Sequence, residues 1–210
     1  MITLYGTPRS RALRVSWLLE ELGLDWQFHF INFSKGENRS DAYLALNPSG
    51  KMPVITDDDF VLTESAAILR YLAEKYAKGQ WLPEPGTQQA GLHERWASFI
   101  ICELEQPLWS MGKHRFALPE DMRLGAMLTV AKWEFDKAAE LAEKWLPENG
   151  FVCGDKPMIA DILLAQTLMW ATVFDQTIPP KLLAYRDRLK LRPALTSALE
   201  KTEAIAKAAQ

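Results

Sequence analysis

Short runs in which apolar and polar residues alternate open the chain. Residues 1–5 form one such run and residues 26–30 form another, and this period of two predicts β-strands. Between them, residues 15–22 place apolar side chains at positions i, i+3, i+4 and i+7, which predicts a helix with one buried face. Gly23 follows at the position where helices commonly end. Strand, helix and strand at this spacing predict a βαβ unit with parallel strands.

A hairpin and another helix are predicted next. Residues 41–46 predict a short helix, and residues 52–56 and 60–62 predict two strands joined by a turn of aspartates. Residues 65–76 predict a longer helix. Its expected buried face consists of Ile68, Leu69, Leu72 and Tyr76. The predicted order over residues 1–77 is therefore βαβαββα.

Beyond this point the pattern is helical. Residues 78–87 hold prolines and glycines and are typical of a linker. The helical stretches that follow are 88–113, 119–145, 158–170, 181–191 and 194–208. The chain is thus predicted to combine an α/β domain at residues 1–77 with an all-helical domain at residues 88–210.

The composition narrows the classes of function. The 210 residues carry a formal net charge of −3 and no basic stripe with interleaved aromatic residues, which argues against nucleic-acid binding. The two cysteines, Cys102 and Cys153, form no CxxC pair, as is typical of a reducing compartment such as the cytoplasm. The three histidines lack the spacing of metal ligands. Neither an apolar run of about 18 residues nor a charged leader is seen, so we expect no membrane span and no signal peptide.

A proline stands inside the third predicted strand. Pro53 lacks the N–H that a central strand needs. One interpretation is an edge strand that tolerates proline. The other is a cis bond between Met52 and Pro53, which would turn the N–H and C=O of Met52 outward to pair with another extended peptide.

Two serines stand where helices are predicted to begin. Ser65 opens one helix, and it can either cap that helix or help the helix N-terminus to hold a carboxylate. The neighbouring Glu64 offers an anion to an ammonium group, so a ligand carrying both groups would fit the pair. Ser10 precedes the first helix, where its hydroxyl can cap the helix or stabilise a ligand thiolate.

Four segments of the chain, in order, resemble the soluble glutathione transferase family. They are "SRALRVSWLLEELGL", "NPSGKMPVITDDDFVLTESAAILRYLAEKY", "FVCGDKPMIADILLA" and "RPALTSALEK". The similarity is to serine-type, theta-like bacterial members. It implies a thioredoxin-like N-terminal domain, an all-helical C-terminal domain, and conjugation of the glutathione thiolate to electrophilic hydrophobic substrates. Glutathione is the implied co-substrate, a homodimer is the implied assembly, and no metal is implied.

The resemblance also implies roles for single residues. Ser10 stabilises the thiolate, and Met52, ahead of a cis Pro53, pairs with the cysteinyl main chain of glutathione. Glu64 and Ser65 hold its γ-glutamyl group. Lys51 and Arg39, the latter with Asn38, contact its glycyl end. Three residues stay open as alternatives for the sulfur contact: Tyr5, Thr7 and Arg9.

The second substrate is expected against the helical domain. The preferred residues, near the break before Pro119, are Trp109, His114 and Phe116, and further candidates are Trp96, Phe99 and Met111. Arg11 and Arg14 could add positive charge near the sulfur, although a structural role is the expected one.

The chain departs from the family pattern at one point, because Met158 replaces the serine or threonine three residues before Asp161, which leaves the helix cap incomplete.

Two alternatives to conjugation remain: a glutathione-dependent peroxidase or thiol reductase on the same fold, and a non-catalytic glutathione-binding protein.

Overall fold

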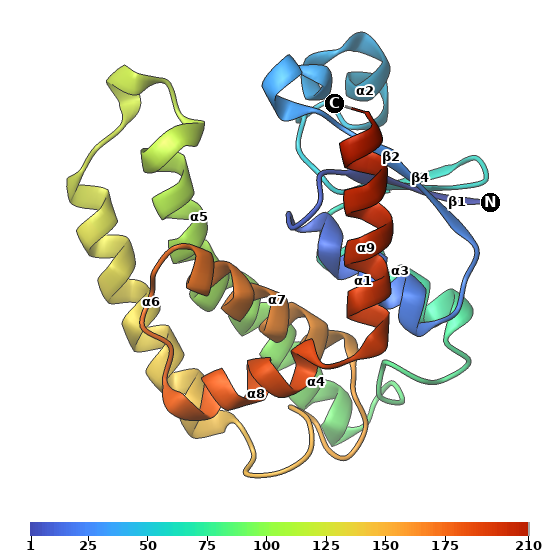
Figure 1. The fold of residues 1–210 in the computed structure, drawn as a ribbon. Helices are drawn as coiled ribbons and strands as arrows, with labels where there is room; N and C mark the ends of the chain where they lie inside the picture. The colour runs from blue at the N-terminus through green and yellow to red at the C-terminus, as the bar shows by residue number, and fades with distance from the viewer. Residues whose placement is uncertain (210) are drawn as a thin grey trace. The chain divides into compact units, whose positions relative to one another are not determined.

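A computed structural model describes residues 1–209 of the chain (Figure 1). These residues form two compact units. The first comprises Met1–Leu82 with the C-terminal segment from Lys190 onward, and the second comprises Pro83–Leu189. None of the helices described within residues 1–209 combines the length and the apolar composition needed to span a bilayer.

The first unit contains a four-stranded sheet with the strand order β2-β1-β3-β4. Its elements are β1 (Ile2–Gly6), α1 (Ala12–Glu21), β2 (Trp26–Phe30), α2 (Asp41–Leu46), β3 (Val54–Asp57), β4 (Phe60–Thr63), α3 (Ser65–Tyr76) and two 3-10 turns, Phe33–Lys35 and Glu37–Arg39. Strands β1 and β2 are parallel, whereas β3 is antiparallel to both β1 and β4. This order confirms the predicted thioredoxin-like fold.

The two faces of the sheet carry different helices. Gly6 ends β1 so close to α1 that a Cβ atom there would lie 2.5 Å from the Cβ of Ala12. Leu4 shares this face by the alternation of the strand and is fully buried. On the opposite face, Tyr5 and Val54 pack with Tyr43 of α2. Glycine at the end of β1 therefore lets α1 start directly against the sheet.

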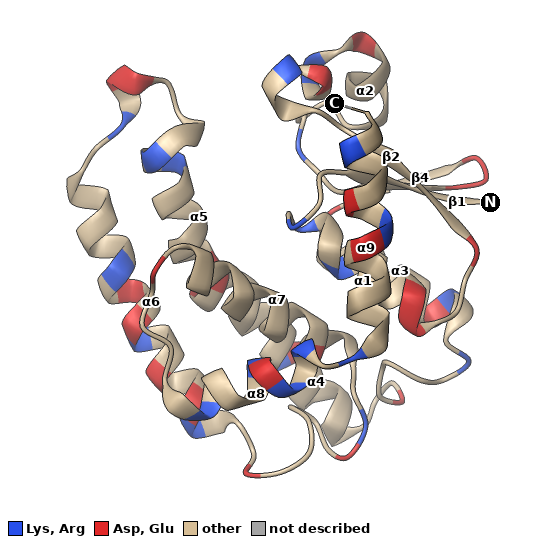
Figure 2. Ribbon diagram, viewed as in Figure 1, with Lys and Arg blue, Asp and Glu red and all other residues tan. Residues whose placement is uncertain are grey.

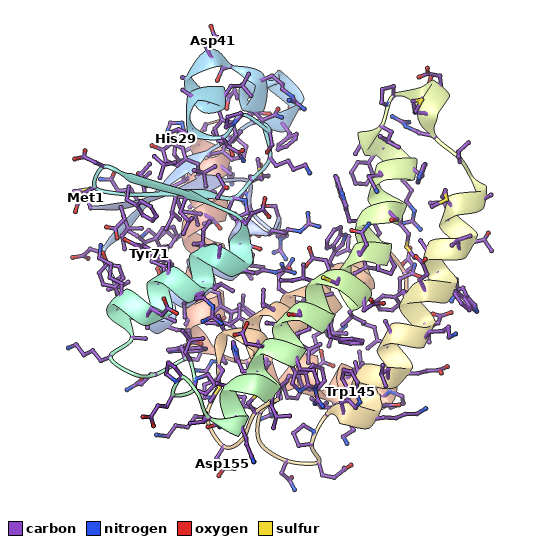
Figure 3. All side chains as sticks on the ribbon, turned by 180° about the vertical axis from the view of Figure 1, so that it is seen from behind. Met1, His29, Asp41, Tyr71, Trp145 and Asp155 are labelled. Atoms are coloured by element: carbon purple, nitrogen blue, oxygen red, sulfur yellow. The ribbon has the colours of Figure 1, made fainter. Side chains whose placement is uncertain are left out.

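Helix α3, which carries the Tyr71 labelled in Figure 3, is held to the sheet by hydrogen bonds from its C-terminal half. Asp57 ends β3, and its Oδ2 accepts hydrogen bonds from the hydroxyls of Tyr71 at 2.7 Å and Tyr76 at 2.6 Å. The Lys75 ammonium binds the same oxygen at 2.6 Å. Burial by itself raises the pKa of Asp57, but these three donors outweigh it and lower the pKa to about 2.

The last helix, α9 (Pro193–Ala208), packs along α1 within the first unit (Figure 1). The guanidinium of Arg192 donates to Glu21 Oε2 at 2.7 Å, and Lys201 Nζ donates to the carbonyl of Trp26 at 2.8 Å. The sequence pattern assigned this segment to the domain at residues 88–210. Periodicity identifies a helix and its apolar face, but it does not identify the surface against which that face packs.

The second unit is helical. Its elements are α4 (Gln88–Phe99), a π-helical segment (Ile100–Glu105), α5 (Gln106–Gly112), a second π-helical segment (Lys113–Ala117), a 3-10 turn (Glu120–Met122), α6 (Ala126–Trp145), α7 (Ile159–Val173) and α8 (Pro180–Lys190). The single helix predicted at residues 88–113 is thus two α-helices joined through a π-helical segment. The helix predicted from residue 119 starts only at residue 126, because the 3-10 turn ends at Arg123 in an extended conformation.

Helix α7 is buried along most of its length and is capped by a carboxylate. Asp161 accepts hydrogen bonds from the main-chain N–H of Met158 at 2.7 Å and of Val152 at 2.9 Å. The hydroxyl of Tyr185 also donates to Asp161. Because Met158 supplies its main-chain carbonyl to the N–H of Asp161 at 2.9 Å, the cap forms without the serine or threonine of the family pattern.

Candidate functional site

Three loops of the first unit meet at one end of the sheet. Val54 pairs with Tyr5 on one side and with Thr63 on the other. The residues that precede Val54 therefore lie at the same end as those that follow Tyr5 and Thr63. This end carries the segments 7–10, 50–53 and 64–65, which hold most of the site residues predicted from the sequence.

The Met52–Pro53 peptide bond is cis. Of the two interpretations of Pro53, the cis bond is thus confirmed. The paired register of β3 begins at Val54, so Met52 stands ahead of the ladder. The main-chain N–H of Thr7 points to the Met52 sulfur at 3.1 Å, which brings the loop after β1 against the loop before β3.

The main chain leading to Met52 is held in place by buried polar groups. The carbonyl of Lys51 accepts from the hydroxyl of Tyr43 at 2.8 Å and from the amide of Asn47 at 2.7 Å. Burial raises the pKa of Tyr43 to about 12, so its hydroxyl remains a donor. The Lys51 side chain is exposed.

Gly50 is packed tightly against the turn at residues 38–39. Its φ is +65°, and a Cβ atom there would lie 2.9 Å from both the carbonyl oxygen of Asn38 and Nη1 of Arg39. The buried amide of Asn38 donates to the Gly50 carbonyl at 3.0 Å. Arg39 is exposed, with its guanidinium 3.4 Å from the carbonyl of Ser49. The turn thus holds the loop in place, and it brings the Arg39 cation to the same loop that carries Lys51.

The start of α3 has a strained backbone. Glu64 has φ 67° and ψ 111°, occupies the N-cap position and makes no side-chain cap hydrogen bond. A non-glycine residue held there costs about 1–3 kcal/mol, and such strain clusters at functional sites. Ser65 is the first helical residue and is buried, so the interpretation of Ser65 as the N-cap is wrong. The Glu64 side chain is exposed.

Arg14 lies beneath this helix start. It is 1% exposed, and its Nη1 donates to the hydroxyl oxygen of Ser65 at 3.2 Å. The sequence suggested only a general structural or electrostatic role for this residue. A stronger signal was available, because Arg14 precedes the buried Trp17 and Leu18 by three and four positions and so shares their helix face. A charged residue on a buried stripe indicates a polar partner inside the protein.

The Ser10 hydroxyl is engaged with its own loop. It donates to the carbonyl of Thr7 at 2.7 Å and accepts from the N–H of Ala12 at 3.1 Å. The N-cap of α1 is Arg11, so the interpretation of Ser10 as the N-cap is wrong, and its hydroxyl instead closes the turn that leads into the helix. The loop turns at Arg9, where φ is +60°, and the Arg9 guanidinium pairs with Glu203 of α9 at 2.6 Å.

Two of the residues that the sequence left open as alternatives to Ser10 for a sulfur contact interact with other parts of the first unit. The hydroxyl of Thr7 donates to the carbonyl of Ile31 at 2.7 Å. The ring of Tyr5 lies 5.1 Å from the ring of His29, within the sheet.

An aromatic cluster gathers around Gly112 in the second unit. From the position of a Cβ atom at Gly112, Phe116 lies at 3.4 Å and both Trp109 and Phe174 lie at 3.6 Å. The ring of Trp170 is 5.6 Å from that of Phe174. The structure thus brings together two predicted residues, Trp109 and Phe116, with two that the sequence analysis missed. The missed pair stands at i and i+4, a spacing that indicates a shared helix face.

The other candidates of this unit have structural contacts. The Nδ1 of His114 accepts from the N–H of Leu124 at 3.1 Å and so braces the loop before α6. Trp96 and Met111 are each 1% exposed and belong to the core. Phe99 packs 4.9 Å from the ring of Trp145, which is labelled in Figure 3.

The described residues include other reactive side chains. Among residues 1–209, no group of histidine, cysteine and carboxylate side chains could hold a metal ion. Burial raises the pKa of the Cys153 thiol to about 11, which disfavours its thiolate. Along the helices of each unit, positive and negative side chains are interspersed (Figure 2).

Comparisons with known proteins point to one family. Residues 1–74 match the model of the N-terminal domain of glutathione S-transferases, and residues 107–193 match that of the C-terminal domain. The chain is 41% identical over 172 residues to glutathione S-transferase 3 of Zea mays, covering 76% of this chain and 73% of the relative. It is 32% identical over 182 residues to glutathione S-transferase theta-1 of Bos taurus, covering 80% and 72%. A solved glutathione transferase homologue from Lodderomyces elongisporus, with two glutathione molecules per subunit, superimposes with a TM-score of 0.82 at 26% identity, covering 95% and 97% of the two chains.

Proposed function

Because the chain belongs to the glutathione S-transferase family and is a glutathione transferase, we propose the residues with which it performs this reaction. The observation that carries the proposal is the main chain of Met52, which stands ahead of the β3 ladder at the end of the sheet where α3 begins. The N–H and C=O of Met52 pair with the cysteinyl main chain of glutathione, as an added strand would.

The charges around this segment match those of the tripeptide. Glutathione carries an ammonium and a carboxylate at its γ-glutamyl end and a second carboxylate at its glycyl end. Glu64 binds the ammonium, and the N-terminus of α3 with the Ser65 hydroxyl binds the neighbouring carboxylate. The exposed cations Lys51 and Arg39 bind the glycyl carboxylate.

Ser10 stabilises the thiolate. A thiol with a pKa near 8.5 is mostly protonated at neutral pH, and lowering that pKa by about two units requires roughly 2.7 kcal/mol of differential stabilisation. The hydroxyl of Ser10 supplies part of this by turning its proton from the carbonyl of Thr7 to the sulfur. The thiolate then attacks an electrophilic carbon, the sulfur–carbon bond forms, and the leaving group departs with its electron pair.

The aromatic cluster of Trp109, Phe116, Trp170 and Phe174 is the proposed surface for the hydrophobic electrophile. Phe116 is 60% exposed, which leaves an aromatic face available to a second reactant. His114, from the same segment, approaches this reactant only if it releases the N–H of Leu124. Binding both reactants on one protein supplies the proximity that the reaction needs.

The homodimer implied by the family is part of the same proposal. The edge strand β4 exposes Phe60 and Val61, and α4 exposes Leu92. Apolar side chains on an edge strand favour a covering partner. Light scattering during size-exclusion chromatography should give twice the chain mass of 23.9 kDa.

Two measurements test the catalytic proposal. Isothermal titration calorimetry should detect glutathione binding to the wild-type protein, and Met52→Pro, which removes the N–H of the docking segment, should abolish that binding. A halonitroarene conjugation assay run beside a hydroperoxide reduction assay should show conjugation as the main activity. Dominant peroxide reduction, or binding that survives in Met52→Pro, would contradict it.

A further inference from the structure

A cation lies at the aromatic cluster formed by Trp109, Phe116, Trp170 and Phe174. The guanidinium of Arg115 lies over the ring of Phe174, with Cζ 4.9 Å from the ring centroid. Phe174 is 8% exposed, whereas Arg115 is exposed. The guanidinium thus covers part of a buried ring while its charge remains accessible from solvent.

The residue next to this cation supplies the exposed aromatic face of the cluster. Phe116 follows Arg115 in the π-helical segment Lys113–Ala117, and its ring lies edge-on to that of Phe174 at a centroid distance of 6.3 Å. Short π-helical turns are rare and occur frequently at functional sites. Because both side chains contact the same ring, a ligand that packs against Phe116 has the Arg115 cation as a neighbour.

The charge of Arg115 is not neutralised by an ion pair. Within residues 1–209, no carboxylate is paired with its guanidinium. The two carboxylates that follow in the sequence, Glu120 and Asp121, lie in an exposed 3-10 turn. Lys113 adds a positive charge to the same segment, while the guanidinium of Arg123 is already bound to two main-chain carbonyls at 2.8 and 3.1 Å. The aromatic surface is therefore bordered by a cation that can accept an anionic partner.

We propose that Arg115 is a specificity-determining residue that favours aromatic electrophiles carrying an anionic substituent such as a carboxylate. This inference rests on the proposed function, in which the second reactant binds at the aromatic cluster. The ring of such a substrate packs against Phe116, and its carboxylate accepts from the planar fork of the Arg115 guanidinium. Because Arg115 already rests on the Phe174 ring, it loses less conformational freedom on binding than a freely moving side chain.

Two halonitroarenes of nearly the same shape test the inference. One is the chloronitrobenzoate whose chlorine is para to the carboxylate and ortho to the nitro group, and the other is the matching benzamide, which is neutral. In both, the glutathione thiolate attacks the carbon that bears chlorine, the sulfur–carbon bond forms, and chloride leaves with the bonding electron pair. The measured quantity is the ratio of kcat/KM for the benzoate to that for the benzamide. Its change between variants is independent of the intrinsic reactivity of the two compounds.

Arg115→Gln removes the charge but keeps a planar group for the Phe174 ring. It should lower kcat/KM for the benzoate about five- to ten-fold, mainly through KM, and alter the benzamide value by less than about two-fold. Because solvent reaches the guanidinium, the preference of wild type for the benzoate should also decline as the salt concentration rises. Arg115→Lys should keep part of the preference, since lysine retains the charge without the planar fork.

Arg95→Gln is the matched control. Arg95 is also exposed, and its guanidinium lies 4.4 Å from the ring centroid of Trp145 in the same unit. This ring is not part of the aromatic cluster. The control thus removes the same charge and a similar contact, and it should leave the benzoate-to-benzamide ratio at the wild-type value.

The outcomes separate this inference from the proposed function. If Phe174→Ala leaves KM for both substrates unchanged, the cluster is not the surface for the electrophile and the proposed function fails at that point. If Phe174→Ala raises both KM values but Arg115→Gln leaves the ratio unchanged, or lowers both kcat/KM values equally, only the role of Arg115 is overturned. An equal loss of the ratio in Arg95→Gln overturns it as well, because the effect is then one of net charge. If Arg115→Gln does not fold, an unchanged ratio in Arg115→Lys overturns the role.

Discussion

The hydrogen bonds that Asp57 accepts allow us to predict how the stability of the first unit changes at acidic pH. Its carboxylate is 3% exposed and holds α3 to the sheet through Tyr71, Lys75 and Tyr76. The pKa of Asp57 in the folded protein is about 2, against an ordinary value of 3.8. Since the folded value is the lower one, the stabilisation is fully present above the ordinary pKa and disappears as the pH falls through the folded one.

The magnitude follows from the difference between the two pKa values. A gap of nearly two pH units corresponds to about 2 kcal/mol of unfolding free energy. Wild type should therefore lose about this amount between pH 5 and pH 2 from Asp57 alone. In Asp57→Asn this pH-dependent part of the unfolding free energy should be absent. The variant should therefore be less stable than wild type at pH 7, and the two stabilities should become similar in acid.

Urea unfolding followed by tryptophan fluorescence, at a series of pH values, measures the effect. Asp58→Asn is the matched control, because Asp58 occupies the same turn but its side chain is 78% exposed and pairs with the N-terminal amine. Its pH profile should follow that of wild type. If Asp57→Asn shows the same loss of stability in acid as wild type, the assignment of this stabilisation to Asp57 is refuted.

Three further changes test the site. Gly50→Ala should weaken glutathione binding at least 10-fold in calorimetry, since a Cβ atom would lie 2.9 Å from the Asn38 carbonyl oxygen. Gly36→Ala is the control, because Gly36 also has a positive φ (+72°) but a Cβ atom there would have no heavy atom within 4 Å. This variant should retain its affinity for glutathione. Ser10→Ala should raise the pKa of bound glutathione, seen as loss of thiolate absorbance at pH 7, and an unchanged titration would remove Ser10 from its role. Phe174→Ala should raise KM for a hydrophobic electrophile several-fold while glutathione affinity stays constant, and a change in glutathione affinity instead would count against the aromatic surface.

The local pattern of apolar and polar residues was sufficient to predict most helices and strands of the first unit. Strand β2 and helices α2 and α3 have the bounds that the sequence predicted, because alternation and helical periodicity reflect which side of one element is buried. The cis bond at Pro53 was one of two open interpretations. The residues proposed for the glutathione site also came from the sequence, through a resemblance carried by short contiguous segments.

Contacts between distant segments needed the tertiary structure. The bond from Arg14 to Ser65 joins residues 51 positions apart, and Arg9 meets Glu203 across most of the chain. Likewise, the surface against which α9 packs is absent from its own periodicity. A sequence pattern records how each side chain relates to its own helix or strand, whereas these contacts depend on which elements the fold brings side by side.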